Sequence, residues 1–449
     1  MRRPAVLPLL AGAALAAACL ATPMPTHAAA DGLPPDTVNH VAWSRQATIY
    51  EVNLRQYTPE GTITAFAAHL PRLKAMGVDI LWLMPLHPIG QKNRKGTLGS
   101  YYAVRDYRGV NPEFGTLADL KALVAQAHQM GMKVILDWVP NHTAWDHPWI
   151  TQHPDWYKKN AQGEIYPVTF GEGPHAEQWT DVVALDYAQP ALRAAMIGEM
   201  GFWLREADVD GFRCDVAGLV PMDFWNEARP ALERIKPVFM LAEWDTPAMH
   251  QSAFDMTYDL KTYDVFKAIA QGQAGKSRLV DHLRNPPQRY PADAYRMVYT
   301  ANHDSNSWNA SDTEAFGAAL PAFAVLAATL PGMPLLYGGQ EGGLDKRLQF
   351  FEKDPIAWKG YPLGPLYTEL FQLKHAHPAL ANGAAGGPLE ILEVLDPQIF
   401  AFRRVKGDDS VTVVVSLSAA PQQLKGHPVL GDVSLDAWGW RIATGGGRR

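Results

Sequence analysis

The feature that most constrains this sequence is a regular alternation of short apolar runs with longer amphipathic stretches, from about residue 45 to 375. Between the apolar runs lie helical patterns such as Leu117–Met130, with apolar residues at steps of three and four. Strands that alternate with helices predict parallel β/α units, and eight such units close most simply into a (β/α)8 barrel of the α/β class. The eight predicted strands are Thr48–Leu54, Asp79–Leu86, Lys133–Val139, Gly211–Ala217, Val238–Glu243, Asp255–Leu260, Arg296–Asp304 and Leu335–Glu341.

Two stretches interrupt this alternation. Residues 143–189 are too long for one β/α loop and are rich in Pro, Gly, His and Trp, so they predict a subdomain inserted after strand three. Residues 385–445 contain alternating apolar runs without a long helical pattern, which predicts a C-terminal antiparallel β domain. The barrel is then expected over 31–142 and 190–378. The Trp residues of the insert are candidates for stacking on a ligand: Trp145, Trp149, Trp156 and Trp179.

The amino end has the layout of an export signal. Arg2 and Arg3 precede an Ala-rich apolar run, and Ala28–Ala30 offers a small-residue cleavage site, so residues 1–30 are predicted to be a signal peptide. Cys19 is the alternative, as the lipidation site of a bacterial lipoprotein. No other stretch is apolar enough to cross a membrane. We therefore expect an exported protein, periplasmic or extracellular, without a transmembrane segment in its mature form.

Composition narrows the classes of ligand. The 449 residues carry a formal net charge of −6, and only 19% of them are charged. An acidic balance argues against nucleic acid, because phosphate binding needs basic surface. The 14 Trp residues suit either large cores or a surface that stacks on flat apolar ligands such as sugar rings. The charge run that contains Lys92, Arg94 and Lys95 is expected to be a solvated loop. Oligomeric state is not indicated.

Polar residues cluster where the predicted strands end. Because a barrel enzyme places its chemistry at the carboxyl ends of its strands, these residues are expected to share one rim. Asp, Glu and Arg are seldom buried without a partner, so their presence inside apolar runs is a specific signal. The residues concerned are Asp137, Asn141 and His142 at strand three, Arg213 and Asp215 at strand four, Glu243 and Trp244 at strand five, and Asn302, His303 and Asp304 at strand seven.

These four segments, in this order, resemble the conserved regions of the α-amylase family of glycoside hydrolases. Three further segments agree with the resemblance: Tyr101–Gly115 before the third strand, Val183–Tyr187 at the end of the insert, and Pro331–Glu341 at the eighth strand. Seven motifs in order are a far more specific signal than any one of them. The resemblance covers residues 45–375 well and the C-terminal region loosely.

The resemblance implies a retaining double displacement at an α-glucosidic bond, for which two carboxyls must flank that bond. Asp215 matches the nucleophile, Glu243 the acid/base and Asp304 the third carboxylate. Arg213 is expected to favour ionised Asp215, and Glu243 beside Trp244 to keep its proton longer. The substrate-binding candidates are Tyr102 as a platform under the sugar, Asp106 as a residue that orients the pocket, His142 and His303 as hydroxyl ligands, Arg213 and Trp244. Asp137 either braces Arg213 or touches substrate.

The sequence departs from the family after the nucleophile. Many members have a Lys-His pair there, which contacts the outgoing sugar and can reach a calcium ion, whereas Val216–Val220 lacks both residues. Asn141 and Asp181 could still supply the oxygen ligands that calcium prefers. The chemistry itself requires no cofactor, no metal ligands are assigned, and a structural calcium ion stays an open alternative.

The expected function is hydrolysis of α-1,4-glucosidic bonds in starch, glycogen or malto-oligosaccharides. The nearest alternatives keep the chemistry and change the substrate: an α-glucosidase, a cyclomaltodextrinase or an α-glucan transglycosylase. A non-catalytic glucan-binding protein is the alternative from another class. Such a protein would have lost a catalytic carboxylate, whereas all three are present here.

Overall fold

The computed structural model describes residues 38–171 and 176–446, all of which belong to one compact unit. The predicted signal peptide 1–30 and Cys19 lie outside these ranges, so export and lipidation stay predictions. Within the two ranges, no helix is both long and apolar enough to cross a bilayer. Cys214, the cysteine of the described chain, is a buried free thiol.

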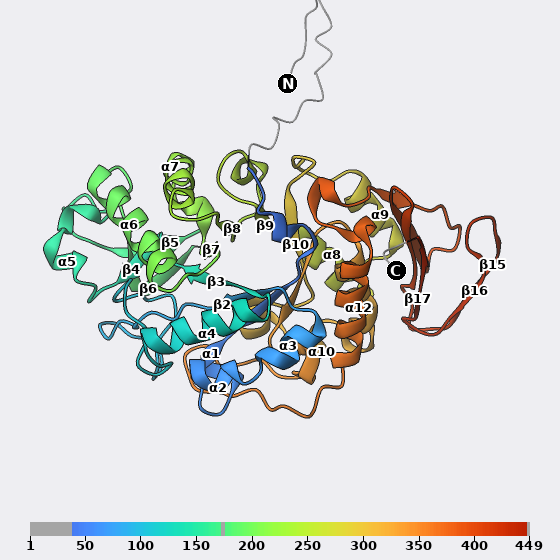
Figure 1. Cartoon of the computed structure of the whole chain (residues 1–449), viewed down its shortest axis with the longest axis horizontal. Coiled ribbons are helices and arrows are strands. Elements are labelled where there is room, and N and C mark those ends of the chain that lie inside the picture. The colour runs from blue at the N-terminus through green and yellow to red at the C-terminus, as the bar shows by residue number, and fades with distance from the viewer. Residues whose placement is uncertain (1–37, 172–175, 447–449) are drawn as a thin grey trace, which may run out of the picture. The chain divides into compact units, whose positions relative to one another are not determined.

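The predicted (β/α)8 barrel is confirmed. Eight parallel strands close in the order β1-β11-β10-β9-β8-β7-β3-β2 (Figure 1). Ile49 of β1 pairs with Ile80 of β2 on one side and with Leu335 of β11 on the other, which closes the sheet. The strands are β1 Ile49–Val52, β2 Ile80–Leu83, β3 Lys133–Trp138, β7 Gly211–Cys214, β8 Phe239–Ala242, β9 Met256–Tyr258, β10 Tyr295–Val298 and β11 Met333–Tyr337.

Each barrel strand lies within its predicted run or within one or two residues of it, but most are shorter at the carboxyl end. The prediction for strand seven ended at Asp304, whereas β10 ends at Val298. The chain leaves the sheet before its polar residues, because Asn302–Asp304 must turn over the rim instead of continuing the ladder. The extra length in the predictions therefore marks the loops that carry the polar residues.

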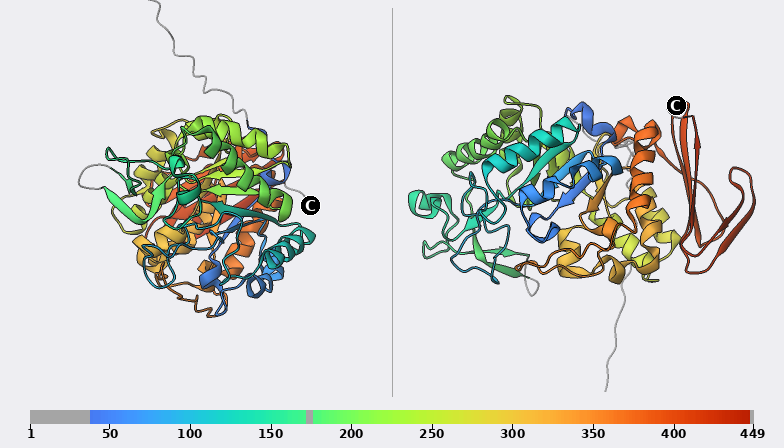
Figure 2. Two further views of the ribbon diagram at one scale, coloured as in Figure 1. Left: turned by 90° about the vertical axis from the view of Figure 1, so that its left-hand side faces the viewer. Right: turned by 60° about the horizontal axis from the view of Figure 1, so that its bottom comes forward.

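Helices cover the outside of the barrel (Figures 1 and 2). Local sequence fixes their ends: α4 begins with a reciprocal capping box between Thr116 and Asp119, and Gly131 at φ 74° lets the chain turn back into β3. The helices are α1 Leu54–Tyr57, α2 Ile63–Ala67, α3 Leu70–Met76, α4 Leu117–Gln129, α5 Trp149–Gln152, α6 Pro190–Glu206, α7 Met222–Glu233, α8 Leu260–Ala270, α9 Lys276–Arg284, α10 Asp312–Ala315, α11 Leu320–Thr329 and α12 Gly364–Ala376.

The segment between β3 and α6 contains its own antiparallel sheet, in the order β4-β6-β5. These strands are β4 His142–Ala144, β5 Pro167–Phe170 and β6 Glu177–Ala184. A small separate core, which includes Val168 and Val182, lies between this sheet and the loop after β2. The sheet corresponds to the predicted insert, although β4 begins one residue before the expected boundary at 143.

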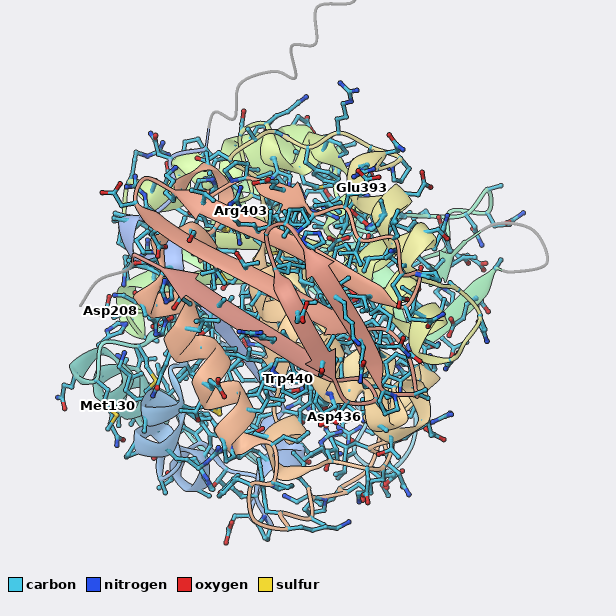
Figure 3. The ribbon with its side chains drawn as sticks, turned by 90° about the vertical axis from the view of Figure 1, so that its right-hand side faces the viewer. Met130, Asp208, Glu393, Arg403, Asp436 and Trp440 are labelled. Carbon is cyan, nitrogen blue, oxygen red and sulfur yellow. The ribbon has the colours of Figure 1, made fainter. Side chains whose placement is uncertain are left out.

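The C-terminal strands form two antiparallel sheets, β12-β13-β14-β17 and β15-β16. They lie at the end of the unit opposite the insert (Figure 2). One face of the larger sheet, with Phe402 and Val413, continues the barrel core, while Ala401 and Val414 pack toward the β15-β16 hairpin. Arg403 lies on the outer side of this sheet (Figure 3), where it pairs with Glu390 at 2.9 Å. The strands are β12 Leu389–Ile391, β13 Ile399–Lys406, β14 Asp409–Ser416, β15 Gln422–His427, β16 Gly431–Leu435 and β17 Trp440–Gly445.

Candidate active site

A pocket of about 430 Å³ lies at the carboxyl ends of the barrel strands. Its volume is within the usual range for small-molecule sites. Of the residues predicted for the site, six line it: Tyr102, His142, Asp215, Glu243, His303 and Asp304. Several others were not predicted for it: Lys95, Ser100, Phe170, Glu177, Val182, Val216, Trp308, Phe350 and Phe351.

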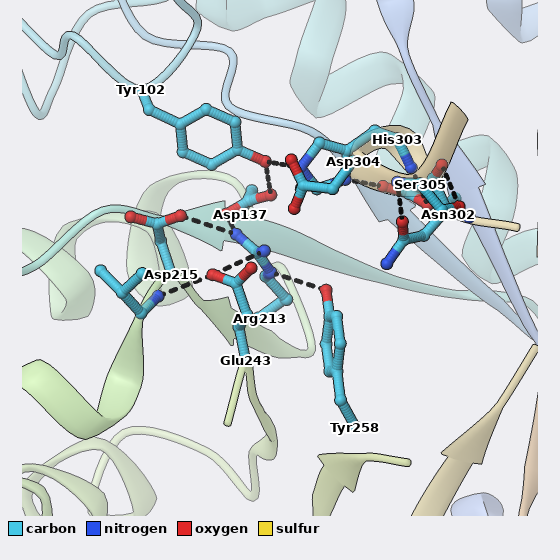
Figure 4. Close-up of polar contacts among 12 residues, drawn as sticks. Tyr102, Asp137, Arg213, Asp215, Glu243, Tyr258, Asn302, His303, Asp304 and Ser305 are labelled. Atoms are coloured by element: carbon cyan, nitrogen blue, oxygen red, sulfur yellow. Dashed lines mark hydrogen bonds and ion pairs between the residues drawn. The ribbon is translucent and has the colours of Figure 1, made fainter. Parts of the chain in front are cut away.

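Arg213 lies at the centre of the carboxylates (Figure 4). Its side chain is fully buried in β7, and its NH1 group donates to Asp137 at 2.7 Å and to Asp215 at 3.2 Å. Its NH2 group is 2.9 Å from Glu243 Oε2. The i, i+2 spacing of Arg213 and Asp215 puts both side chains on one side of the strand. Asp137 therefore braces Arg213, and one guanidinium holds both Asp215 and Glu243.

The backbone after β7 also contributes to the pair. Val216 has φ 36° and ψ 47°, a left-handed conformation that is costly for a β-branched residue. In this conformation its N–H donates to Glu243 Oε2 at 2.8 Å. Oε2 of Glu243 is therefore held by this backbone N–H and lies beside the positively charged guanidinium of Arg213.

The charge of Asp215 differs from the sequence expectation. Burial and repulsion by Glu243 raise its pKa well above the usual range, although Arg213 opposes the rise. Burial also raises the pKa of Asp137 to about 6, again against Arg213. Arg213 therefore moderates a rise in the pKa of Asp215 but does not bring it below normal. The buried cluster tends to retain a proton.

The two histidines of the pocket differ in charge. Burial lowers the pKa of His142 to about 4, so its ring is neutral. Burial alone would also lower the pKa of His303, but the carboxylates of Asp304 and Glu51 raise it to about 9. His303 Nε2 lies 2.8 Å from the Tyr102 hydroxyl and 3.3 Å from Asp304 Oδ2. Glu51, which no sequence motif indicated, is thus part of the surroundings of the site.

Aromatic side chains form two walls of the pocket. On one side Phe170 and Trp179, from β5 and β6, stack at 5.3 Å and 13°. On the other side Trp308 contacts Phe350 at 4.9 Å, and 52% of its surface is exposed. Of the Trp candidates in the insert, Trp179 therefore reaches the pocket, while Trp145, Trp149 and Trp156 are not among its lining residues.

Three predicted binding residues do not line the pocket: the buried Arg213, described above, and Asp106 and Trp244. Asp106 is exposed and accepts a hydrogen bond from the Arg108 N–H at 2.9 Å, so it stabilises its own turn and does not orient the pocket. Trp244 is not a lining residue: its indole packs directly on Gly218, where a Cβ atom would come within 2.0 Å of the ring. Neither the motif that indicated Asp106 nor the strand-end position of Trp244 distinguishes these residues from those that face the pocket.

Lys95 is part of an ion pair at the pocket and not of a fully solvated loop, which differs from the sequence-based expectation. Its ammonium lies 3.2 Å from Asp181 Oδ1, and the side chains are 33% and 6% exposed. This ion pair joins the loop after β2 to β6 of the insert, and both residues line the pocket. Lys92 contacts the Trp145 ring at 5.2 Å, and Arg94 donates to the Gly90 carbonyl at 2.8 Å.

The two oxygen donors considered for calcium each have a polar neighbour in the structure. Asp181 is already neutralised by Lys95, and the side-chain amide of Asn141 lies 3.1 Å from His142 Nδ1. In residues 38–171 and 176–446, no three His, Cys, Asp or Glu side chains are grouped closely enough to bind a metal ion. A divalent cation would have to displace the lysine ammonium.

A closed parallel barrel with paired carboxylates at its carboxyl rim defines a barrel-type glycoside hydrolase. Residues 35–359 match the model of the alpha amylase catalytic domain. This chain therefore belongs to the α-amylase family.

Individual relatives agree with the family assignment. The chain is 29% identical over 400 residues to alpha-amylase MalA of Haloarcula japonica, covering 85% of this chain and 56% of the relative. It is 28% identical over 432 residues to an alpha-1,4-glucan:maltose-1-phosphate maltosyltransferase of Rhodospirillum rubrum, covering 87% of this chain and 59% of the relative. The chain thus spans little more than half the length of these two relatives.

Among solved structures, the chain is similar to an alpha-amylase from Lactobacillus plantarum, with a TM-score of 0.79 and 32% identity over 90% of this chain and 99% of the other. It is also similar to the maltogenic alpha-amylase AmyB of Thermotoga neapolitana, with a TM-score of 0.74 and 30% identity over 90% and 97% of the two chains.

Proposed function

We propose that this chain is an exported α-amylase-type hydrolase that cleaves α-1,4-glucosidic bonds of starch, glycogen or malto-oligosaccharides with retention. The observation that carries the proposal is that Asp215 and Glu243 are held by NH1 and NH2 of one guanidinium. A retaining mechanism needs two carboxyls close together across the bond, and a shared guanidinium provides that closeness.

In the first step, the free oxygen of Asp215 bonds to the anomeric carbon while the bond to the leaving oxygen breaks. Glu243 gives its proton to that oxygen. In the second step, water gives a proton to Glu243, its oxygen bonds to the anomeric carbon, and the bond to Asp215 breaks. Charged His303 and neutral His142 supply different hydrogen-bonding partners for sugar hydroxyls, beside the Tyr102 ring and Asp304.

The test is turnover of maltoheptaose by Asp215→Asn and Glu243→Gln variants. General acid catalysis alone contributes about 10²- to 10⁴-fold, so each variant should lose at least about a hundredfold in kcat. Asp223→Asn is the matched control, because that carboxylate is 71% exposed on α7 and does not line the pocket. Turnover near that of the unmodified enzyme in either site variant would refute the assignment, and retention is checked by the anomer first released.

Transfer to phosphate or another sugar is the nearest rival, because one relative is named as a maltose-1-phosphate maltosyltransferase. The charge of the pocket argues against a phosphorylated substrate. Its one lysine, among the described lining residues, is paired with Asp181, and the lining has a surplus of carboxylates: Glu177, Asp181, Asp215, Glu243 and Asp304. A neutral glucan avoids this repulsion. Chromatography of products from maltoheptaose, with and without inorganic phosphate, separates hydrolase, α-glucosidase, cyclomaltodextrinase and transferase activity.

Export is part of the proposal and is supported by the charged, then apolar, then small-residue layout of residues 1–30. Amino-terminal sequencing of the protein recovered from the periplasm of an expressing bacterium should start at Asp31. A start at a lipid-modified Cys19 would instead support membrane attachment. A cytoplasmic protein that still begins at Met1 would refute export.

A further inference from the structure

One buried carboxylate beside the pocket takes no part in the reaction described above. Glu51 lies in β1, and its surface is fully buried. Its Oε1 is 2.5 Å from His303 Nδ1, and its Oε2 accepts the His303 backbone N–H at 3.3 Å. Each carboxylate oxygen therefore contacts the same residue, once through its ring and once through its backbone.

The opposite edge of the His303 ring faces the pocket. Its Nε2 atom lies between the Tyr102 hydroxyl and the Asp304 carboxylate, and His303 and both of these partners line the pocket. A ring held by an anion at Nδ1 has its orientation fixed, and its second nitrogen is directed at whatever occupies the pocket. This is the arrangement by which an outer carboxylate orients a functional imidazole.

We infer that Glu51 is a positioning residue that keeps His303 doubly protonated, so that Nε2–H, which contacts the Tyr102 hydroxyl and Asp304 in this structure, is a fixed, charged donor that a hydroxyl of the bound sugar takes over. The inference rests on the proposed hydrolysis of α-glucans. A purely structural ion pair would contribute stability but would not couple the charge of Glu51 to catalysis.

The surroundings determine what removal of this charge should do. Burial of the ring opposes its protonation, so the carboxylates must offset that cost. Without Glu51, Asp304 would be the nearest remaining anion, and its side chain is 41% exposed. The other titratable groups that face the pair from neighbouring elements are Tyr102, Asp137, Arg213, Tyr258 and Tyr337.

The experiment compares kcat/KM for maltoheptaose from pH 5 to 9.5 in the unmodified enzyme and in Glu51→Gln. The kcat/KM of the unmodified enzyme divided by that of Glu51→Gln should be near its minimum at pH 5–6, where the His303 imidazole is protonated in both. This ratio should grow at least tenfold by pH 8.5. Glu51→Asp keeps the charge and should return the alkaline limb toward that of the unmodified enzyme. In a His303→Gln background, Glu51→Gln should change kcat/KM less than twofold.

Glu341→Gln is the matched control. Glu341 is an equally buried glutamate that binds the Tyr50 hydroxyl at 2.6 Å and Arg72 at 2.9 Å, so its loss should lower the thermal midpoint and leave the shape of the pH profile unchanged. A Glu51→Gln profile parallel to that of the unmodified enzyme, or an equal loss in the His303→Gln background, would overturn the inference. If Asp215→Asn also retained full turnover, the proposed function itself would be wrong; if only the Glu51 results failed, the proposed function would stand.

Discussion

Replacing Arg213 by Gln tests the charge arrangement on which the site depends. The change removes the buried cation that contacts Asp137, Asp215 and Glu243. Gln keeps the side-chain stem as far as Cδ and a polar end, but it is shorter than Arg and cannot reach all three carboxylates. The change therefore removes the buried charge and adds a small cavity.

The magnitude follows from the burial of Asp137. Its side chain is completely buried, and its other hydrogen bonds come from the Trp82 ring N–H and the Tyr102 hydroxyl, both at 3.1 Å. Loss of the partner of a buried ion typically costs about 3–5 kcal/mol. Asp137 can limit this cost by taking a proton, since its pKa is already raised to about 6 with Arg213 present.

The sign of the pH dependence is then fixed. A carboxyl whose folded pKa is raised gives stability that is present at low pH and is lost as pH rises through the folded pKa. Without Arg213, which opposes that rise, the loss should extend to higher pH than in the unmodified protein. The stability gap between Arg213→Gln and the unmodified protein should thus widen above pH 6, by up to about 1.4 kcal/mol per pH unit.

The assay is urea unfolding followed by Trp fluorescence at pH 6 and pH 8, together with maltoheptaose turnover. The double variant Arg213→Gln/Asp137→Asn also removes the Asp137 carboxylate that has lost its partner. It should regain most of the stability but not the activity. A gap that does not change with pH, or a double variant no more stable than the single one, would refute this reasoning. Recovered activity in the double variant would mean that Arg213 serves only to neutralise Asp137.

Three further predictions concern other parts of the molecule. Addition of a chelator should leave the unfolding midpoint and turnover unchanged, and a midpoint that falls on chelation and recovers with Ca²⁺ would contradict this. Lys95→Met should lower the free energy of unfolding by about 1 kcal/mol, because it leaves the buried Asp181 carboxylate without its cation. Trp308→Ala should raise KM for long malto-oligosaccharides by roughly 2- to 10-fold, because about 0.5–1.5 kcal/mol of stacking is lost. The free energy of unfolding should change little, since the ring is 52% exposed. An equal effect on maltotriose and maltoheptaose would argue against a remote sugar contact. Burial lowers the pKa of His87 to about 4, so its contribution to stability should fall as pH drops from about 6.5 to 4, and His87→Gln should flatten that limb of the stability curve; an unchanged limb would show that other groups control acid unfolding.

The barrel was predictable because its strands are buried on both faces and therefore appear as short, nearly continuous apolar runs. The same property made the pocket residues visible: Arg213 and Asp215 are conspicuous because an apolar run rarely contains charge. Sequence position placed six of the predicted residues at one rim, since every parallel strand delivers its carboxyl end there.

The rest depended on loops and on contacts between distant segments. Trp308 and Phe350 come from different loops and meet only after folding. Lys95 looked like a solvated charge because its partner, Asp181, lies in another segment of the chain. The prediction for Asp106 was wrong for a different reason. Its motif matched, but its carboxylate accepts a hydrogen bond from the neighbouring backbone. Local pattern identifies which residues lie near the rim, and packing decides which way each one faces.

The charge count of the buried cluster suggests why one site can hold both an acid and a nucleophile. Asp137, Asp215 and Glu243 all contact Arg213, so full ionisation would leave two uncompensated negative charges beside one guanidinium. Burial makes that state costly, and it raises the pKa of Asp215 and Asp137 accordingly. The cluster therefore favours a state with at least one proton. A cluster that holds one shared proton can present a carboxylate and a carboxylic acid side by side, which is the pair that a nucleophile and an acid at one glycosidic bond require.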